Sequence, residues 1–165
     1  MYCKSCSAPT WIIAMIAGFA LLFSTIALFK NNANIGIQAE LVDAGGGIIA
    51  DGTNVMFDNV VNDQSNYISY NATTDEFTIT KRVNDTVSWW AAPDGAGPAT
   101  TIDLVVAVDG VPYSTASSPI VSDEMATCAL VTVDTVPATI LLVNVTGEDI
   151  FVPLTTVQAG IVITK

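Results

Sequence analysis

The hydrophobic positions divide this chain into two unlike parts. Residues 11–29, WIIAMIAGFALLFSTIALF, form an apolar run of 19 residues without a charged side chain. As a helix this run spans roughly 28 Å, close to the thickness of the hydrocarbon core of a bilayer. Beyond it, apolar and polar residues alternate in short runs, which is the pattern of half-buried β-strands.

About ten such strands are expected, separated by glycines, prolines and short polar turns. No helical period appears after residue 30, and Asp109-Gly110 predicts a tight hairpin. The pattern therefore predicts an all-β fold, a jelly-roll sandwich. The strands are expected at residues 35–42, 54–61, 67–70, 77–80, 86–91, 101–108, around Tyr113, 126–133, 139–145 and 158–164.

The same pattern predicts the domain organisation. We expect a short tail at residues 1–10, a transmembrane or signal-anchor helix at 11–29, a joint at 30–34 and a jelly-roll ectodomain at 35–165. A cleaved signal peptide is one alternative, but the apolar run is long for one and no A-x-A cleavage site follows Phe29. A buried soluble helix is another. The anchor predicts a membrane-attached domain at the surface, whereas cleavage predicts a secreted one.

Charge is distributed unevenly. Residues 1–30 carry two lysines and no acid, a charge of +2, whereas residues 31–165 carry three basic residues against 16 acidic ones, a charge of −13, which together give the net charge of −11. A domain this acidic repels phosphate backbones, so nucleic acid is not an expected partner. The chain also lacks histidine, the commonest general base and zinc ligand. No nucleotide-binding or hydrolase motif occurs, so we predict no enzymatic activity, no cofactor and no metal.

Acidic pairs and cysteines are the remaining candidates for chemistry. The pairs at residues 75–76, 123–124 and 148–149 fall at expected turns. We therefore favour their interpretation as solvated turn residues over a calcium site or the acid–base pair of a glycosidase. Cys3 and Cys6 have C-x-x-C spacing, but no thioredoxin-like or zinc-ligating context accompanies them. Beside an apolar helix they suit cross-linking between chains or acylation. Cys128, within an apolar strand, is expected to be a core residue.

Two segments predict contact between subunits. Trp89 and Trp90 are adjacent in an expected strand, so they point to opposite faces and only one of them can enter the core. Residues 139–145, TILLVNV, are apolar on both faces, which indicates either a central strand under a loop or an outer face covered by another chain. The candidate contact residues are Trp89, Trp90, Ile140, Leu141, Leu142 and Val143.

Four motifs carry a resemblance that covers roughly residues 35–164. They are Tyr67–Asp75, Phe77–Lys81, Val87-Ser-Trp-Trp90 and Asp94-Gly-Ala-Gly-Pro-Ala99. In these the chain resembles the C-terminal domain of collagen-like and exosporium surface proteins of spore-forming Firmicutes. That family implies a trimeric jelly roll related to tumour-necrosis-factor and complement-head domains. The chain departs from it by having no Gly-X-Y repeat, and hence no collagen stalk.

Together these features predict a non-enzymatic structural module of the cell or spore surface that assembles as a homotrimer. One alternative is a surface-displayed module that binds a glycan or a protein receptor through its loops. Another is a self-polymerising appendage subunit in which Cys3 and Cys6 lock neighbouring chains together. No residue set in the sequence identifies a ligand.

Overall fold

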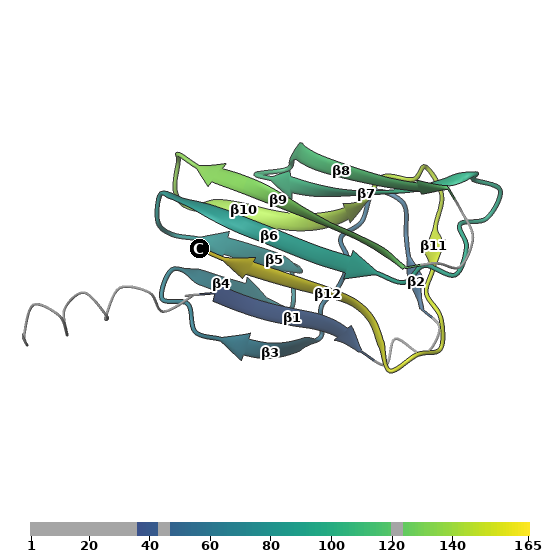
Figure 1. The fold of residues 1–165 in the computed structure, drawn as a ribbon, viewed down its shortest axis with the longest axis horizontal. Coiled ribbons are helices and arrows are strands. Elements are labelled where there is room, and N and C mark those ends of the chain that lie inside the picture. The colour runs from purple at the N-terminus through teal and green to yellow at the C-terminus, as the bar shows by residue number, and fades with distance from the viewer. Residues whose placement is uncertain (1–35, 43–46, 120–123) are drawn as a thin grey trace, which may run out of the picture. The chain divides into compact units, whose positions relative to one another are not determined.

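A computed structural model describes residues 36–42, 47–119 and 124–165, which form an all-β sandwich (Figure 1). The predicted helix at 11–29, its preceding tail with Cys3 and Cys6, and the joint at 30–34 lie outside the described residues. Within the described ranges no helix has the length and apolar character needed to cross a membrane.

Two antiparallel sheets of five strands face each other. The front sheet has the order β3-β1-β12-β6-β9, the rear sheet has the order β4-β5-β10-β7-β8, and a short ribbon pairs β11 with β2. The front strands are β3 (Asn59–Asp63), β1 (Gly36–Val42), β12 (Val157–Thr164), β6 (Val83–Ala91) and β9 (Met125–Val133). The rear strands are β4 (Ile68–Asn71), β5 (Glu76–Ile79), β10 (Ala138–Asn144), β7 (Thr101–Val108) and β8 (Val111–Pro119). The ribbon strands are β2 (Ile48–Ile49) and β11 (Ile150–Phe151).

The core lies between the two sheets, because alternate residues of each strand point inward. In β10, Ile140 and Leu142 are buried while Leu141 is half-buried on the outer side. Phe57 and Phe77 are fully buried with ring centroids 6.0 Å apart. Each buried ring contributes a few kcal/mol to the stability of the sandwich.

The tight hairpin predicted at Asp109-Gly110 is confirmed. The two residues connect β7 to β8, and both have positive φ, 51° for Asp109 and 74° for Gly110. Two consecutive positive φ values are what a two-residue hairpin with the right-handed strand twist requires, and Asp and Gly tolerate them. The expected strand at 101–108 coincides with β7.

The prediction of one strand at residues 54–61 is wrong. Asn54 forms a bridge with Val143 of the rear sheet, whereas β3 begins at Asn59 and belongs to the front sheet. The chain therefore crosses from one sheet to the other between these points. Val55 and Phe57 still alternate into the core during the crossing, which is why the sequence pattern looked continuous.

A buried amide fixes the ribbon that the sequence pattern did not predict. Asn144 is fully buried, and its Nδ2 donates to the backbone oxygens of Ile49 and Glu148, both at 2.9 Å. Its Oδ1 accepts from the Thr146 N–H at 2.9 Å. One side chain at the end of β10 thus connects β2 to the turn that precedes β11. Because its polar atoms have these hydrogen-bond partners, burying the amide costs little free energy.

Candidate functional site

The outer face of the front sheet is the first candidate surface. Cross-strand pairing places Trp90 beside Gly160 of β12 and Ala126 of β9. In the next row, Ser88 of β6 lies between its partners Val162 of β12 and Cys128 of β9. A shallow groove of about 430 Å³ lies over these rows. We call this surface the front face.

Trp90 and Gly160 fit together closely. A Cβ atom added to Gly160 would come within 2.5 Å of the Trp90 Nε1, well below van der Waals contact. Glycine therefore lets the indole lie against β12, which leaves Trp90 half-buried on the outside of the sheet. Trp89 points the other way and is only 2% exposed. The expectation that the two tryptophans take opposite faces is confirmed.

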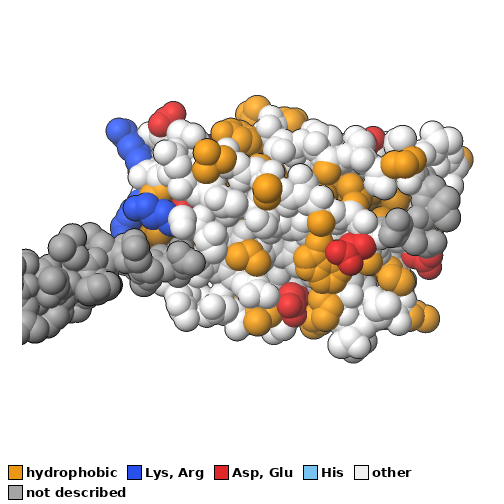
Figure 2. Space-filling view, in the orientation of Figure 1, with side chains coloured by type: hydrophobic (Ala, Val, Ile, Leu, Met, Phe, Trp, Pro, Cys, Tyr) orange, Lys and Arg blue, Asp and Glu red, His pale blue; other side chains and the backbone are white. Residues whose placement is uncertain are grey.

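The front face has few acidic side chains although the chain is strongly acidic. Among the residues that line its groove, Glu40 and Glu124 are the acidic ones, and the rest are apolar, small or uncharged polar residues. Figure 2 shows this side of the molecule, where acidic side chains are few among apolar and neutral surface. Leu130, which pairs with Thr86, is 66% exposed on the same side of β9 as Cys128. The face thus offers apolar contact area without a dense negative charge.

Cys128 is exposed, so the prediction that it is a core residue is wrong. In β9 the core is filled by Met125, Val131 and Val133, which all point inward. Cys128 lies an odd number of residues from each of them and therefore points outward.

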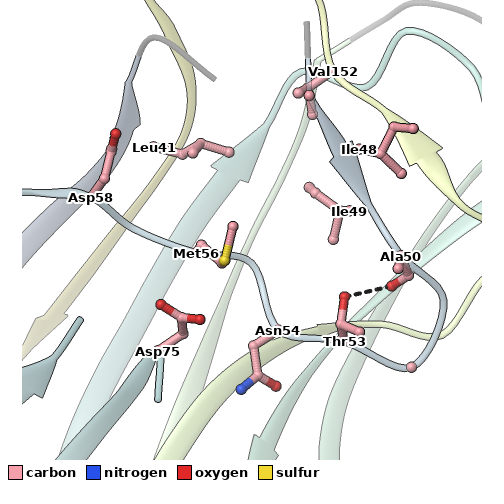
Figure 3. A pocket seen from close by; sticks show the side chains of 12 residues that line it. Leu41, Ile48, Ile49, Ala50, Thr53, Asn54, Met56, Asp58, Asp75 and Val152 are labelled. Carbon is pink, nitrogen blue, oxygen red and sulfur yellow. Dashed lines mark hydrogen bonds between the residues drawn. The ribbon is translucent and has the colours of Figure 1, made fainter. Parts of the chain in front are cut away.

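A second candidate is an open pocket of about 730 Å³ at the end of the sandwich where β1 ends and the ribbon lies (Figure 3). Its walls are mostly apolar, from Leu41, Ile48, Ile49, Met56 and Val152. Asp58 and Asp75 line the same pocket on the side of Met56 away from the isoleucines. We call it the ribbon pocket.

The two carboxylates of the ribbon pocket are held by defined contacts. Asp58 Oδ1 accepts the Val42 N–H at 2.8 Å, and Asp75 Oδ1 accepts the Tyr70 hydroxyl at 3.1 Å. Tyr70 also accepts the Phe57 N–H at 2.9 Å. Burial first, and then the charges of Asp75 and Asp58, raise the pKa of Tyr70, against the opposing effect of the Phe57 N–H. Asp75 thus contacts the Tyr70 hydroxyl directly, whereas Asp58 acts on it only through its charge.

A third polar cluster is buried within the sandwich. Asp85 of β6 is 0% exposed, and its Oδ1 accepts the Tyr67 hydroxyl at 2.8 Å while its Oδ2 has no partner among the described residues. Burial raises the pKa of Asp85, although the Tyr67 hydrogen bond and the charge of Lys165 act in the opposite direction. No pattern in the sequence singled out this aspartate, because it occupies an inward position of a strand that is otherwise apolar.

The structure separates the residues predicted for subunit contact. Trp89, Ile140 and Leu142 are at most 2% exposed in the core of their own protomer, so they have no surface to offer another chain. Trp90 lies on the front face. Leu141 and Val143 lie half-buried on the outer side of the rear sheet, beside Ala107 and Val105. Trp90 therefore lies on a different surface from Leu141 and Val143.

No group of three or more metal-ligating side chains occurs in the part of the chain that the structure describes. Of the acidic pairs, Asp75 lies in the turn before β5, and Glu148 and Asp149 are exposed between β10 and β11. The turn interpretation therefore holds for Asp75, Glu148 and Asp149, whereas Glu76 is the first residue of β5.

Comparison with solved structures identifies the fold. The globular domain of the zebrafish complement 1qA protein aligns with a TM-score of 0.56 and 11% identity over 78% of this chain and 93% of its own. The Eiger TNF structure from S. frugiperda aligns with a TM-score of 0.60 and 8% identity over 80% and 92%. The fold is a jelly roll of the complement-head and tumour-necrosis-factor kind. At these identities the similarity establishes the fold alone, and comparisons with family models and with curated proteins find no match.

Proposed function

We propose that this chain is a non-enzymatic module of the cell or spore surface that assembles as a homotrimer through its front face. The observation that carries the proposal is a partly apolar face with few acidic side chains on a strongly acidic domain. Residues 31–165 carry a net charge of −13, so copies of the domain repel one another over most of their surface. On the front face that repulsion is limited, because Glu40 and Glu124 are the acidic residues among those that line its groove.

Apolar contact area on this face supports the same assembly. Leu130 is 66% exposed and Trp90 is half-buried, with Ala126, Val162 and Cys128 beside them. Tryptophan is enriched among the side chains that supply most of the binding energy in protein interfaces, and the centres of interfaces are apolar and depleted of charged residues. The similarity in fold to complement-head and tumour-necrosis-factor domains agrees with a trimer of this kind.

A matched pair of leucine variants tests the proposal. In Leu130→Asp a charge is placed on the front face, and in Leu154→Asp the same change is made in the β11–β12 connection, where Leu154 is 83% exposed. Sedimentation velocity of residues 31–165 is expected to give trimers for wild type and Leu154→Asp, and monomers for Leu130→Asp. Trimers of equal stability for both variants would show that the front face is not part of the interface.

Membrane attachment and the spore-surface family remain predictions from the sequence. They rest on residues 11–29 and on the motifs between Tyr67 and Ala99, respectively. Cross-linking through Cys3 and Cys6 is likewise a prediction for residues outside the described ranges. A fractionation experiment with an antibody to the sandwich distinguishes a retained anchor, with protein in the membrane fraction, from a cleaved signal, with protein in the medium.

A further inference from the structure

The basic side chains of the sandwich gather at one of its ends. Beyond residue 30 the chain holds three of them, Lys81, Arg82 and Lys165. Lys81 and Arg82 lie between β5 and β6, and Lys165 directly follows β12. The end of β12 pairs with the start of β1 and with the first half of β6, so all three cations lie at the end where β1 begins. In Figure 2 the blue side chains of lysine and arginine appear at this end, which we call the proximal end.

These three cations are not neutralised by a carboxylate. In the part of the chain that the structure describes, none of them forms an ion pair. Lys81 Nζ donates to the uncharged Asn66 Oδ1 at 2.7 Å and lies 5.3 Å from the centre of the Tyr67 ring. The side chains of Lys81, Arg82 and Lys165 are exposed. They are therefore available to pair with negative groups outside the chain.

Acidic side chains at the proximal end lie closer to the backbone than the cations. Strand pairing places Asp63, Asp109 and Asp134 at this end, and Asp85 there is fully buried. Asp63 and Asp109 each accept a backbone N–H through Oδ1, at 3.2 and 2.8 Å. Lysine and arginine have longer side chains than aspartate, so positive charge extends farthest from the sandwich at this end.

Much of the negative charge of the domain lies too far away to oppose the proximal end. Asp51, Asp94 and Asp149 lie at the opposite end, in the loops around the ribbon (Figure 1). The nine residues of β6 alone span about 30 Å, whereas physiological salt screens charges over about 8 Å. The acidity of the whole domain therefore does not prevent its proximal end from binding an anionic surface.

The length of the chain before β1 brings this end close to the predicted membrane. Residues 30–35 alone separate the helix predicted at residues 11–29 from Gly36, the first residue of β1. Six fully extended residues reach at most about 20 Å. If the helix spans the bilayer, the start of β1 must lie within that distance of the hydrocarbon boundary. The proximal end is then the part of the sandwich that faces the lipid headgroups.

We propose that the proximal end binds the anionic headgroups of the membrane in which the chain is anchored. Lys81, Arg82 and Lys165 pair with lipid phosphates, and the ribbon at the opposite end points away from the membrane. The short connection keeps the cations at a high local concentration near the lipid, so three charges are sufficient for weak, reversible binding. The inference rests on the membrane attachment proposed above and does not involve the front face.

Lysine acetylation followed by mass spectrometry tests the proposal on the full chain in lipid nanodiscs of phosphatidylcholine, with or without anionic phosphatidylglycerol. Leu154→Lys supplies a reference amine at the opposite end, because Leu154 is 83% exposed. Lys81 and Lys165 are expected to react several-fold more slowly in the anionic discs, and high salt should abolish the difference. The amine at position 154 should react equally in both lipids. Equal rates for Lys81 and Lys165 in the two lipids would overturn the proposal.

Two variants of equal net charge locate the surface. Arg82→Gln removes one cation from the proximal end, and Leu154→Asp adds one acid at the opposite end. Arg82→Gln is expected to reduce the protection of Lys81 up to about fivefold, the effect of one basic residue at an anionic surface. Leu154→Asp should leave that protection unchanged. No loss in Arg82→Gln, or an equal loss in both variants, would overturn the assignment to the proximal end.

A tethered form of the domain separates this inference from the predicted anchor. Residues 31–165 are attached to vesicles of the same two compositions through an N-terminal histidine tag and a nickel-chelating lipid. If the full chain does not enter the discs, the anchor prediction fails, and protection of Lys81 on the tethered domain still decides whether the proximal end binds lipid. The oligomeric mass of Arg82→Gln is expected to equal that of wild type, because Arg82 does not line the front-face groove. The lipid contact and the trimer are thus tested independently.

Discussion

The contact of Trp90 with Gly160 gives the sharpest prediction for the front face. In Gly160→Ala the new Cβ would lie 2.5 Å from Nε1, 3.2 Å from Cε2 and 3.3 Å from Cδ1 of the indole. All three distances are shorter than normal contact between such atoms, so the indole or β12 must move. Overpacking of this kind costs about 1–3 kcal/mol. Replacing glycine in a strand otherwise gains about 0.4–1 kcal/mol by restricting the unfolded chain, so the net loss is about 1–2 kcal/mol.

Trp90→Ala supplies the control background, because it removes the atoms that the new methyl group meets. In that background Gly160→Ala is expected to stabilise the protein by up to ~1 kcal/mol, which reverses the sign of the effect. Urea unfolding of the four proteins at one fixed protein concentration measures both values, since assembly makes stability depend on concentration. An equal effect of Gly160→Ala in the two backgrounds would refute the reasoning.

Three further predictions concern buried and reactive groups. Because the folded-state pKa of Asp85 is raised above its ordinary value of 3.8, the folded protein binds this proton more tightly than the unfolded chain, so its stability should rise as the pH falls through the folded pKa. Asp85→Asn should flatten that dependence in urea unfolding measured across the acid range, and an unchanged slope would contradict it. Tyr67→Phe leaves the Asp85 carboxylate without its hydroxyl donor and should cost about 1–3 kcal/mol, whereas the exposed Tyr113→Phe should stay within about 0.5 kcal/mol. Cys128, exposed in the single chain, should react slowly with a thiol reagent in the assembled wild type and rapidly in Leu130→Asp; equal rates would argue against its burial by a neighbouring copy.

The sequence was sufficient for the fold class and for most strands, because alternation with period two is strong in this chain. Residues 101–108 alternate clearly, and the structure has β7 there. The strand around Tyr113 was expected to be short, yet β8 runs from Val111 to Pro119. Its Ser and Thr residues carry little hydrophobic signal, and pairing with β7 rather than composition makes it a strand.

Contacts between distant residues account for what the sequence could not predict. The ribbon depends on Asn144, whose hydrogen bond to Ile49 joins positions 95 residues apart. The ribbon pocket depends on that ribbon, so its residues had no local signature. In the sequence, Asp58 fell within the expected strand at 54–61 and Asp75 at an expected turn, and only the crossing of the chain between the sheets places both in one pocket.

Strand geometry explains why the prediction for Cys128 failed and the prediction for the two tryptophans succeeded. In residues 125–133 and 138–144 apolar side chains occupy both faces of a strand, so alternation alone does not say which set enters the core. Cys128 was expected to point into the core, but it points outward. For Trp89 and Trp90 only the opposition of the two side chains was predicted, and that much follows from strand geometry alone.

The central claim is that this sandwich assembles from three copies of one chain. Light scattering coupled to size exclusion on residues 31–165, at micromolar concentration, measures the mass directly. The residues from Ile35 to Lys165 form one compact unit, which makes this segment suitable for the experiment. A mass three times that of the single chain, stable on dilution, is the predicted result. A monomer at the same concentration would contradict the claim.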